Sequence, residues 1–329
     1  MSIKNWNAGI IRPVAVAPDG PYENGAAPGV WTLDQMAYWK KQGLWPTAGI
    51  APPRALFAGG ETTTAVNTIN YVQIGTTGNA SDFGDLITVL YKGAALGSAT
   101  RSVFAAGNTT NVMSYVTSAT TGNSTDFGDL SGMNKEFGGA SNSTRGLFFG
   151  GSSNTISYIT IATTGNSTDF GDMLLAASLP TGCGSSTRGI MAGGFTGAFN
   201  TINFVTYSTT GNATDFGDLL YAPDSDPGGC SNSIRGIIGG GLVNDNTINY
   251  ITIASAGNAL DFGNLTTTDS YGPAAASSPT RGLFAGGSPF QNTINYVTID
   301  SAGNALDFGD LLYSPSYHPT GTSNAHGGL

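Results

Sequence analysis

Arg188-Gly-Ile-Met-Ala-Gly-Gly194, followed after a short loop by Asn200-Thr-Ile-Asn-Phe-Val-Thr-Tyr-Ser-Thr-Thr-Gly-Asn-Ala-Thr-Asp-Phe-Gly-Asp-Leu219, is one copy of a unit that occurs six times in this chain. The arginines that begin the copies are spaced 43 to 47 residues apart: Arg54, Arg101, Arg145, Arg188, Arg235 and Arg281. Self-similarity with such a period is typical of propellers and solenoids. The repeat therefore outranks every other signal for the fold class.

Each repeat divides into four predicted strands, which we name a, b, c and d. In the fourth copy, strand a is the small-residue run 181–186, strand b begins at Arg188, strand c covers 201–207 and strand d is Asp215-Phe-Gly-Asp-Leu219. The link between c and d contains Gly and Asn, which suit the positive φ angles of tight hairpin turns. Four antiparallel strands in about 45 residues form one propeller blade. We predict an all-β, six-bladed propeller over residues 47–329.

Two segments resemble the innermost strand of the first blade, which needs only one. Pro46-Thr-Ala-Gly49 and Pro319-Thr-Gly321 both match Pro180-Thr-Gly182 of the fourth copy. The turn Pro52-Pro-Arg54 favours the first segment. Closure of a propeller by strands from both ends of the chain favours the second, and we expect residues 319–325 to supply this strand.

Residues 1–46 differ in kind from the repeats and are predicted to form an extended arm with a short helix. They contain every tryptophan of the chain: Trp6, Trp31, Trp39 and Trp45. Thr32-Leu-Asp-Gln35 is a capping box that predicts the start of a helix over about 33–42. Gly43 is well placed to end it. The tryptophans are candidates for attachment to another protein.

The repeats resemble two known groups of proteins. The Gly-Gly pairs at 59–60, 150–151, 193–194 and 286–287, each followed by a strand with an aromatic residue, are similar to Kelch repeats, although the Kelch tryptophan is absent. Thr-Thr-Gly-Asn-Ala-Thr-Asp-Phe-Gly-Asp-Leu219 more specifically resembles repeats in virion structural and tail proteins of tailed phages, many of them marine phages or cyanophages. The stretch 29–46 looks like one that recurs in phage tail and virion proteins.

The resemblance implies a Kelch-like propeller in a non-enzymatic virion structural protein, such as a tail fibre, baseplate or tail-associated protein. It would be made in the host cytoplasm, join other virion proteins through the arm, and display the propeller for host attachment through a surface glycan. A homo-oligomer is compatible with such a role. Two alternatives stay open: a structural or capsid-decorating protein without a receptor, and a carbohydrate-active propeller enzyme.

Composition argues against several other functions. The net charge of −9 comes without a basic stripe, which disfavours nucleic-acid binding. No apolar run is long enough for membrane insertion, and the first residues lack the apolar core of a secretory signal. The only histidines are His318 and His326. Without a nucleophile elbow, a phosphate-binding loop or a cluster of metal ligands, we expect no catalytic residue, metal or cofactor.

The recurring charged residues are interpreted as structural. We expect each repeat arginine to pair with an aspartate and to bind turn carbonyls, rather than to form an anion-binding ring. The first aspartates of the strand d motif are Asp82, Asp126, Asp169, Asp215, Asp261 and Asp307. Calcium takes six to eight oxygen ligands, so turn capping is the better account of these carboxylates. Cys183 and Cys230 occupy equivalent positions in neighbouring blades and are predicted to be free thiols.

Loops on one face of the propeller vary in length and sequence. The b–c and d–a links share this variable face, whereas the a–b and c–d links share the opposite one, which we name the turn face. Binding residues often lie on variable loops that a rigid scaffold holds. The candidate receptor-binding aromatics are Tyr91, Phe137, Phe195, Phe199, Tyr221, Tyr271, Phe290, Tyr313 and Tyr317. The alternative is that several of them only cover the blade ends.

Overall fold

The computed structural model describes residues 5–6, 9–10, 32–41 and 52–329, except for 106, 108–109, 133–135, 196–198, 224–225, 242–245, 268–270, 289–290 and 315–317. The chain forms two compact units, Met1–Pro52 and Pro53–Leu329, with the division after Pro52 rather than after residue 46. The predictions for Trp31, Gly43, Trp45, Phe290 and Tyr317, and for the closing segment 46–51, fall outside the described residues.

The first unit contains one helix and two short strands. Strands β1 (Asn5–Trp6) and β2 (Gly9–Ile10) pair antiparallel. Helix α1 (Leu33–Lys41) begins at the predicted capping box: the amide of Gln35 donates to Thr32 Oγ1 at 3.2 Å, and the amide of Thr32 donates to Gln35 Oε1 at 3.0 Å. This reciprocal pair confirms the predicted start of the helix.

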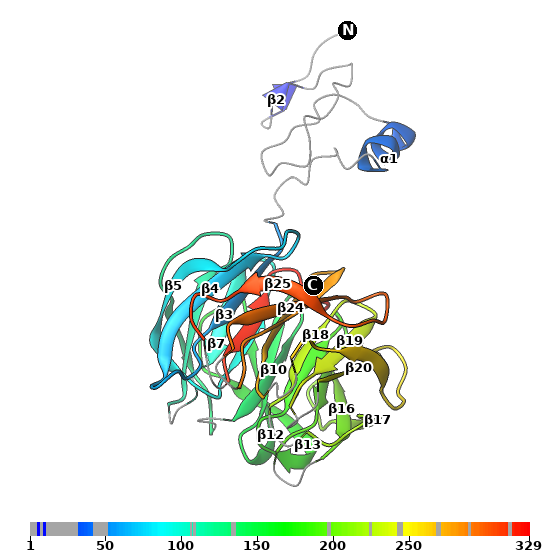
Figure 1. The fold of residues 1–329 in the computed structure, drawn as a ribbon. Coiled ribbons are helices and arrows are strands. Elements are labelled where there is room, and N and C mark those ends of the chain that lie inside the picture. The colour runs from blue at the N-terminus through cyan, green and yellow to red at the C-terminus, as the bar shows by residue number, and fades with distance from the viewer. Residues whose placement is uncertain are drawn as a thin grey trace. The chain divides into compact units, whose positions relative to one another are not determined.

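The second unit is a six-bladed β-propeller, as the repeat predicts (Figure 1). Each blade is an antiparallel sheet whose strands are described from the innermost outward. Blade 1 contains β26 (Thr320–Ser323), β3 (Arg54–Ala58), β4 (Val66–Gln73) and β5 (Ser81–Leu90), and blade 2 contains β6 (Ala94–Gly97), β7 (Arg101–Ala105), β8 (Val112–Thr117) and β9 (Thr125–Asp129). Blade 3 contains β10 (Phe137–Ser141), β11 (Arg145–Gly150), β12 (Ser153–Thr160) and β13 (Thr168–Ala177), and blade 4 contains β14 (Thr181–Gly184), β15 (Arg188–Ala192), β16 (Thr201–Thr206) and β17 (Thr214–Asp218). Blade 5 contains β18 (Gly228–Ser231), β19 (Arg235–Gly239), β20 (Thr247–Thr252) and β21 (Leu260–Asn264), and blade 6 contains β22 (Ala274–Ser277), β23 (Arg281–Ala285), β24 (Thr293–Thr298) and β25 (Leu306–Asp310).

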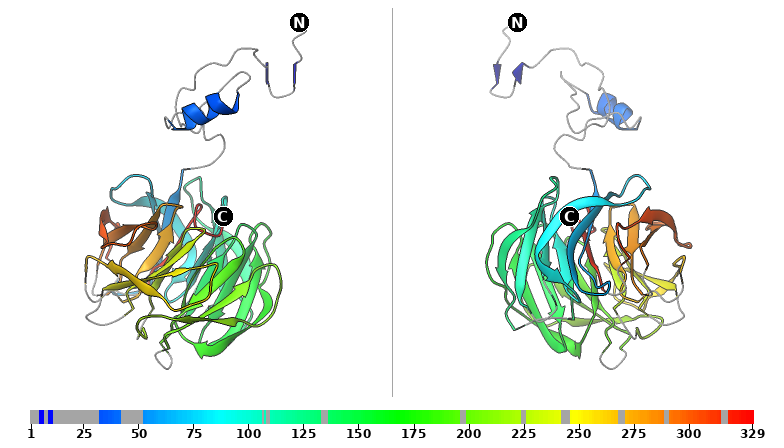
Figure 2. Two further views of the ribbon diagram at one scale, coloured as in Figure 1. Left: turned by 90° about the vertical axis from the view of Figure 1, so that its right-hand side faces the viewer. Right: turned by 60° about the vertical axis from the view of Figure 1, so that its left-hand side comes forward.

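The innermost strands form a closed ring around one axis. Each contacts the innermost strands of both neighbouring blades, in the order β6, β10, β14, β18, β22, β26 and back to β6. Figure 2 shows the blades of this unit from two further sides. Because blades pack face to face, both faces of strands b and c are buried. Each of the six hydrophobic clusters accordingly joins two neighbouring blades, as Val103 of blade 2 and Phe148 of blade 3 illustrate.

The ring closes through strand β26, as expected for residues 319–325. Thr320 pairs with Ala58 and Ser323 with Ala55, so the red end of the chain in Figure 1 completes the blade that β3 begins. The amide of Arg54 donates to Asn324 Oδ1 at 2.8 Å. Asn142 and Asn232 accept in the same way from Arg145 and Arg235. Blade 1 is therefore built like the others, from two distant parts of the chain.

Strand d of every blade carries a bulge onto which the c–d turn of the next blade locks. In blade 4, Asn203 pairs with Asp215 and Ile202 with Gly217, so Phe216 is the extra residue. The amide of Gly257 in the next blade donates to the Phe216 carbonyl at 2.7 Å. Gly217 has φ +145°, and a Cβ there would lie 2.5 Å from the Gly257 carbonyl oxygen. The glycine of each Asp-Phe-Gly motif is therefore required by a backbone contact between blades.

The repeat arginines also tie each blade to the next, but not through aspartate. Arg188 Nη1 donates to the carbonyl of Ile253 in blade 5 at 2.9 Å, while its guanidinium lies 4.7 Å from the ring centroid of Phe204. All six arginines make the equivalent bond, and Arg281 closes the circle on Ile74 of blade 1. Within the described part of the chain, none of the six guanidinium groups forms an ion pair with an aspartate. The predicted binding to turn carbonyls is confirmed, and the predicted pairing with aspartate is wrong.

A further contact between blades uses either of two residue pairs. In blade 4, Asn203 Oδ1 accepts a hydrogen bond from the Leu174 amide of blade 3 at 3.1 Å, and the turn residue is Ala213. In blade 2, where strand c carries a serine instead, Ser124 Oγ in the turn accepts from the Ile87 amide of blade 1 at 3.0 Å. Blades 1, 5 and 6 carry the Asn–Ala pair and blade 3 carries the Ser–Ser pair. The hydrogen-bond acceptor for this amide therefore lies either on strand c, as an asparagine, or in the c–d turn, as a serine.

Cys183 and Cys230 are free and buried, as predicted. Burial raises the pKa of the Cys183 thiol to about 12 and the pKa of Cys230 further still. Each sulfur fills the space beside the glycine that follows the arginine of the next blade: a Cβ at Gly236 would lie 2.8 Å from Cys183 Sγ. Both thiols are therefore packing groups between blades.

Candidate functional site

One position near the axis differs in every blade. It lies two residues before the innermost strand in five blades and directly before it in blade 3, at the end of that strand which belongs to the variable face. The six residues that occupy it, from blade 2 around to blade 1, are Lys92, Glu136, Leu179, Asp226, Gly272 and His318. We name this ring the axial mouth. The contacts between blades repeat six times, whereas the axial mouth holds six different side chains.

The backbone of the axial mouth is strained. Lys92, Glu136, Leu179 and His318 have φ between +49° and +65°, and Gly272 has φ +58°. A left-handed conformation costs a residue other than glycine about 1–2 kcal/mol. It allows hydrogen bonds to run around the ring: the Glu136 amide donates to the Lys92 carbonyl at 2.7 Å, and the Leu179 amide to the Glu136 carbonyl at 2.8 Å. The strained residues are thus linked by backbone hydrogen bonds around this end of the axis.

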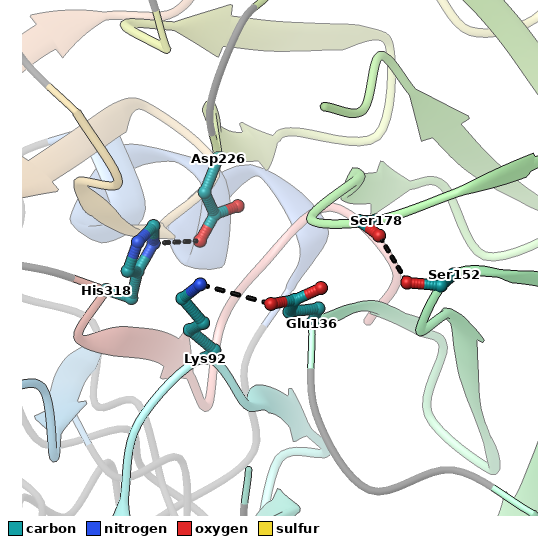
Figure 3. A network of polar contacts seen from close by, with 6 residues as sticks. All are labelled: Lys92, Glu136, Ser152, Ser178, Asp226 and His318. Carbon is teal, nitrogen blue, oxygen red and sulfur yellow. Dashed lines mark hydrogen bonds and ion pairs between the residues drawn. The ribbon is translucent and has the colours of Figure 1, made fainter. Parts of the chain in front are cut away.

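An ion pair joins blades 2 and 3 at the axial mouth. Lys92 Nζ lies 3.1 Å from Glu136 Oε1, and both side chains are largely buried (Figure 3). The same ammonium lies 5.4 Å from the ring centroid of Tyr91, at the distance of a cation–π contact. Ser178, next to Leu179, is hydrogen-bonded to Ser152 at 2.7 Å in the same network. Long side chains at this site are therefore held in place by their neighbours.

A second pair reaches across a blade. His318 Nδ1 of blade 1 lies 3.5 Å from Asp226 Oδ2 of blade 5, and blade 6 between them contributes only Gly272 (Figure 3). A Cβ at Gly272 would lie 2.7 Å from His318 Nδ1, so glycine leaves the room that the imidazole occupies. Tyr91 packs edge-on against the His318 ring, with centroids 5.6 Å apart. Residues of blades 1, 2, 3 and 5 therefore share one network.

The carboxyl group of Asp226 is perturbed by its surroundings. Burial raises its pKa, while the hydrogen bond and charge of His318 and the charge of Lys92 act in the opposite direction. Burial dominates, so the ionised carboxylate is less favourable here than in water. An acid held in this way in a cavity is a candidate for binding.

Two small cavities follow one another along the axis from the mouth inward. The outer cavity, about 60 Å³, is bounded by the first residues of the innermost strands, and Asp226 is the one ionisable side chain among the described residues of its wall. The inner cavity, about 50 Å³, is bounded by the ends of the same strands and by His326. One alanine or glycine of each blade borders both cavities: Ala95, Gly139, Gly182, Gly229, Ala275 and Gly321. Only small residues fit this waist, because the strands converge there.

Residues 324–329 cross the axis at the turn face. His326 Nε2 lies 2.9 Å from the Gly97 carbonyl oxygen, and the Gly328 amide donates to His326 Nδ1 at 3.1 Å. The amide of Gly327 donates to the Ser231 carbonyl at 2.9 Å. These bonds fix the neutral imidazole with its proton on Nε2, since a carbonyl only accepts and an amide only donates. The axial space is therefore covered at the turn face by a bonded segment.

The aromatic residues predicted for receptor binding are in different environments. Tyr91 lies at the axial mouth, and Phe195 is 57% exposed on the variable face. Phe137 is only 3% exposed and packs between blades 2 and 3. The hydroxyl groups of Tyr221 and Tyr313 donate at 2.6 Å to the carbonyls of Gly240 and Gly59 in the next blade.

These last contacts favour the alternative that some aromatics cover the blade ends. Burial raises the pKa of the Tyr313 hydroxyl, as expected for a phenol held in this way. Phe199 and Tyr271 are half-buried. Of the candidate attachment residues, only Trp39 has a described side chain: it is half-buried on α1, with its ring 5.2 Å from that of Tyr38.

The sequence reasoning did not identify the charged residues of the axial mouth. A signal was available, because the residue nine positions before the arginine is different in every repeat that contains both: Lys92, Glu136, Leu179, Asp226 and Gly272. When the repeats are aligned, a position that varies in every copy can be recognised even though none of its residues belongs to a known motif.

The residues that the structure describes include no group of three His, Cys, Asp or Glu side chains arranged to hold a metal ion. No helix among them is long and apolar enough to cross a membrane.

Comparison of the chain with protein-family models finds no match, and comparison with curated proteins finds none either.

Proposed function

We propose that this protein is a non-enzymatic binding component of a tailed-phage virion, in which the propeller attaches to the host surface through its variable face. The observation that carries the proposal is the axial mouth: on a scaffold whose six blades share the same contacts with their neighbours, one ring near the axis holds Lys92, Glu136, Asp226 and His318. A ring with a purely structural role needs the same residue in all six blades, whereas recognition of a ligand needs different residues at these positions. The backbone strain at this ring fits the same interpretation, because strained residues cluster at functional sites.

The virion part of the proposal is supported by the repeat Thr-Thr-Gly-Asn-Ala-Thr-Asp-Phe-Gly-Asp-Leu219 and by the stretch 29–46, which resemble virion proteins of tailed phages. In this role residues 1–46 attach the protein to other virion components, and Trp39 on α1 is one described candidate contact. A surface glycan is the proposed receptor, because Tyr91 and the exposed Phe195 on the variable face offer rings on which a sugar can stack.

Retention on cells tests the adhesive role. The purified full-length protein is mixed with candidate host cells and, separately, with their extracted surface polysaccharide, and the retained fraction is measured against protein concentration. We expect saturable retention that free polysaccharide competes away. Phe195→Ala should reduce retention, whereas Ile234→Ala, which removes an equally exposed apolar side chain from the a–b link of blade 5 on the turn face, should not. Retention that never saturates, or that both variants leave unchanged, contradicts adhesion through this face.

Two further outcomes correspond to the alternatives. A protein that assembles with virion components through its first 46 residues but never binds cells is a structural or decorating part of the particle. Release of new reducing ends from the polysaccharide by the purified protein would identify a carbohydrate-active enzyme. We expect no such release, since Lys92 and Glu136 pair with each other and Asp226 lies against His318.

A further inference from the structure

The outer axial cavity has a charge preference of its own. Three side chains that carry charge at neutral pH lie at the axial mouth: the cation Lys92 and the anions Glu136 and Asp226. Lys92 binds Glu136 at 3.1 Å, whereas Asp226 has the His318 nitrogen only at 3.5 Å, which is long for a hydrogen bond. Glu136 and Asp226 together carry one more formal negative charge than the positive charge of Lys92. The group that this site lacks is a cation with hydrogen-bond donors.

The residues that line the cavity also favour a cation. Among the described residues that border the outer cavity, Asp226 is the only ionisable one. Alanine, glycine and proline make up most of the rest, including Ala94 and Pro319. Lys92, whose charge acts on Asp226, pairs with Glu136 and is not part of this described wall, so a cation in the cavity would meet the Asp226 carboxylate first. An anion would meet the carboxylate as a like charge in a poorly hydrated space, where repulsion is strong.

Size and coordination decide which cation fits. The outer cavity of about 60 Å³ is several times the roughly 10–15 Å³ that one water molecule requires on the same measure. That volume admits an ammonium group and the carbon that carries it. Hard divalent ions take about six or more oxygen ligands, and one carboxylate does not supply them. A primary ammonium brings three donors and needs fewer partners.

Residues 324–329 cover the axis at the turn face, where His326 bonds to Gly97. The waist between the two cavities is bordered by small residues such as Gly182 and Ala275, whose strands are in contact. A ligand group therefore enters at the axial mouth and stops above the waist. One axis per propeller implies one ligand group per chain.

We propose that the outer axial cavity binds the free primary ammonium group of an amino sugar, with Asp226 as its counter-ion. The sugar ring stays outside the cavity, on the side of the variable face where Tyr91 lies. This inference rests on the proposed function, since it specifies the glycan that the adhesive face recognises. It excludes glycans whose amino groups are all acetylated, because an amide carries no charge.

Calorimetric titration of the full-length protein at neutral pH tests the inference, with D-glucosamine, N-acetyl-D-glucosamine and D-glucose as probes. We expect 1:1 binding of glucosamine, and binding of the other two sugars that is weaker by about tenfold or more, because they lack the charge-assisted bond. Asp226→Asn should weaken glucosamine binding by a similar factor. Asp215→Asn, the same charge change on an exposed residue of the outermost strand, should leave it within about twofold.

A second variant tests whether the space in the cavity is needed in addition to the carboxylate. Ala95→Leu keeps the carboxylate and fills space beside the waist, so it should also abolish glucosamine binding. A cooperative melting transition, at a temperature not much below that of the wild-type protein, shows that each variant is folded. Equal binding of N-acetylglucosamine, or full binding by Asp226→Asn, overturns the inference. Saturable retention on cells without any response to glucosamine also overturns it and leaves the adhesive function standing, whereas loss of retention itself contradicts the adhesive function.

Discussion

The contacts between blades and the axial mouth use the same scaffold for opposite purposes. Between blades, one arrangement is repeated six times: a turn locks onto a strand d bulge, and an arginine such as Arg188 binds a carbonyl of the next blade. At the axial mouth, one backbone position is repeated with Lys92, Glu136, Asp226 and His318 among its side chains. The repeated contacts tie the blades together, whereas the variation at one fixed position is the feature on which the proposed recognition rests. Substitutions in the two regions should therefore have different consequences.

The largest effect is expected where blades meet through backbone. Gly217→Ala should destabilise the protein by about 3–5 kcal/mol, since it combines a strained φ with a clash against Gly257. Gly211→Ala is the matched control: its φ is +153°, but its Cβ would meet nothing within 4 Å. The control should lose only the strain, about 1–3 kcal/mol. Chemical denaturation measures both, and equal losses would show that the close approach is unimportant.

Next in size is the loss of a guanidinium. Arg188→Ala removes a charge-assisted hydrogen bond to Ile253 and the contact with Phe204, and should cost about 2–3 kcal/mol. Arg188→Lys should recover only part of this loss, because an ammonium lacks the planar fork. Asp215 is exposed, so Asp215→Asn should change stability by less than about 0.5 kcal/mol. A loss at Asp215 as large as that at Arg188 would restore the pairing that the sequence suggested.

Because the acceptor of this hydrogen bond can lie on strand c or in the c–d turn, a substitution at the second position should compensate for its loss at the first. Asn203→Ser should leave the Leu174 amide without its acceptor and cost about 1 kcal/mol. Adding Ala213→Ser recreates the arrangement of blade 2, in which Ser124 accepts the equivalent bond, and should restore most of the loss. A double-mutant cycle in urea measures the coupling. Additive effects would mean that the two positions are independent.

Closure at the turn face should depend on pH. Burial lowers the pKa of His326, which the hydrogen bond to Gly97 opposes, so the folded protein favours the neutral ring. Stability from this group is therefore complete above the ordinary histidine pKa of about 6.5 and is lost as pH falls through the lower folded value. Melting temperatures recorded across this range should fall more steeply for the wild-type protein than for His326→Gln. Parallel profiles would exclude His326 as the cause.

The smallest effect, and one of opposite sign, is expected at the axial mouth. Because burial raises the pKa of Asp226, its stabilising contribution is present in acid and is lost as pH rises through the folded pKa. At neutral pH the carboxylate is therefore a cost, and Asp226→Asn should raise the melting temperature. The gain should disappear below the ordinary aspartate pKa of about 3.9, where both states are protonated. A lower melting temperature at neutral pH would make Asp226 a structural residue.

The sequence predicted what repetition encodes. The period gave six blades, the capping box gave the start of α1, and the likeness of Pro319-Thr-Gly321 to other innermost strands gave the closure by β26. Partners that have no side-chain signature could not be predicted. Equal numbers of arginine and aspartate suggested pairing, whereas the acceptors are backbone carbonyls such as that of Ile253, which every residue possesses.

The candidate site was harder to predict because its members are far apart in sequence. Asp226 and His318 meet only because blade 6 contributes a glycine between them, at Gly272. Tyr221 and Tyr313 have the composition of a binding surface, yet their hydroxyl groups bind carbonyls of neighbouring turns. Whether an aromatic side chain on a loop faces solvent or a turn depends on the next blade, which the local sequence does not describe.

The position of strand β26 has a consequence for synthesis of the protein on the ribosome. Arg54 and Asn324, which are bonded in blade 1, are 270 positions apart, so at about 5–20 residues per second roughly 14 to 54 seconds separate their translation. During that interval the inner edge of β3 has no partner strand. A product released before residue 320 keeps this edge open permanently, and open strand edges promote aggregation. Translation of residues 320–323 is thus the event that allows the ring to close.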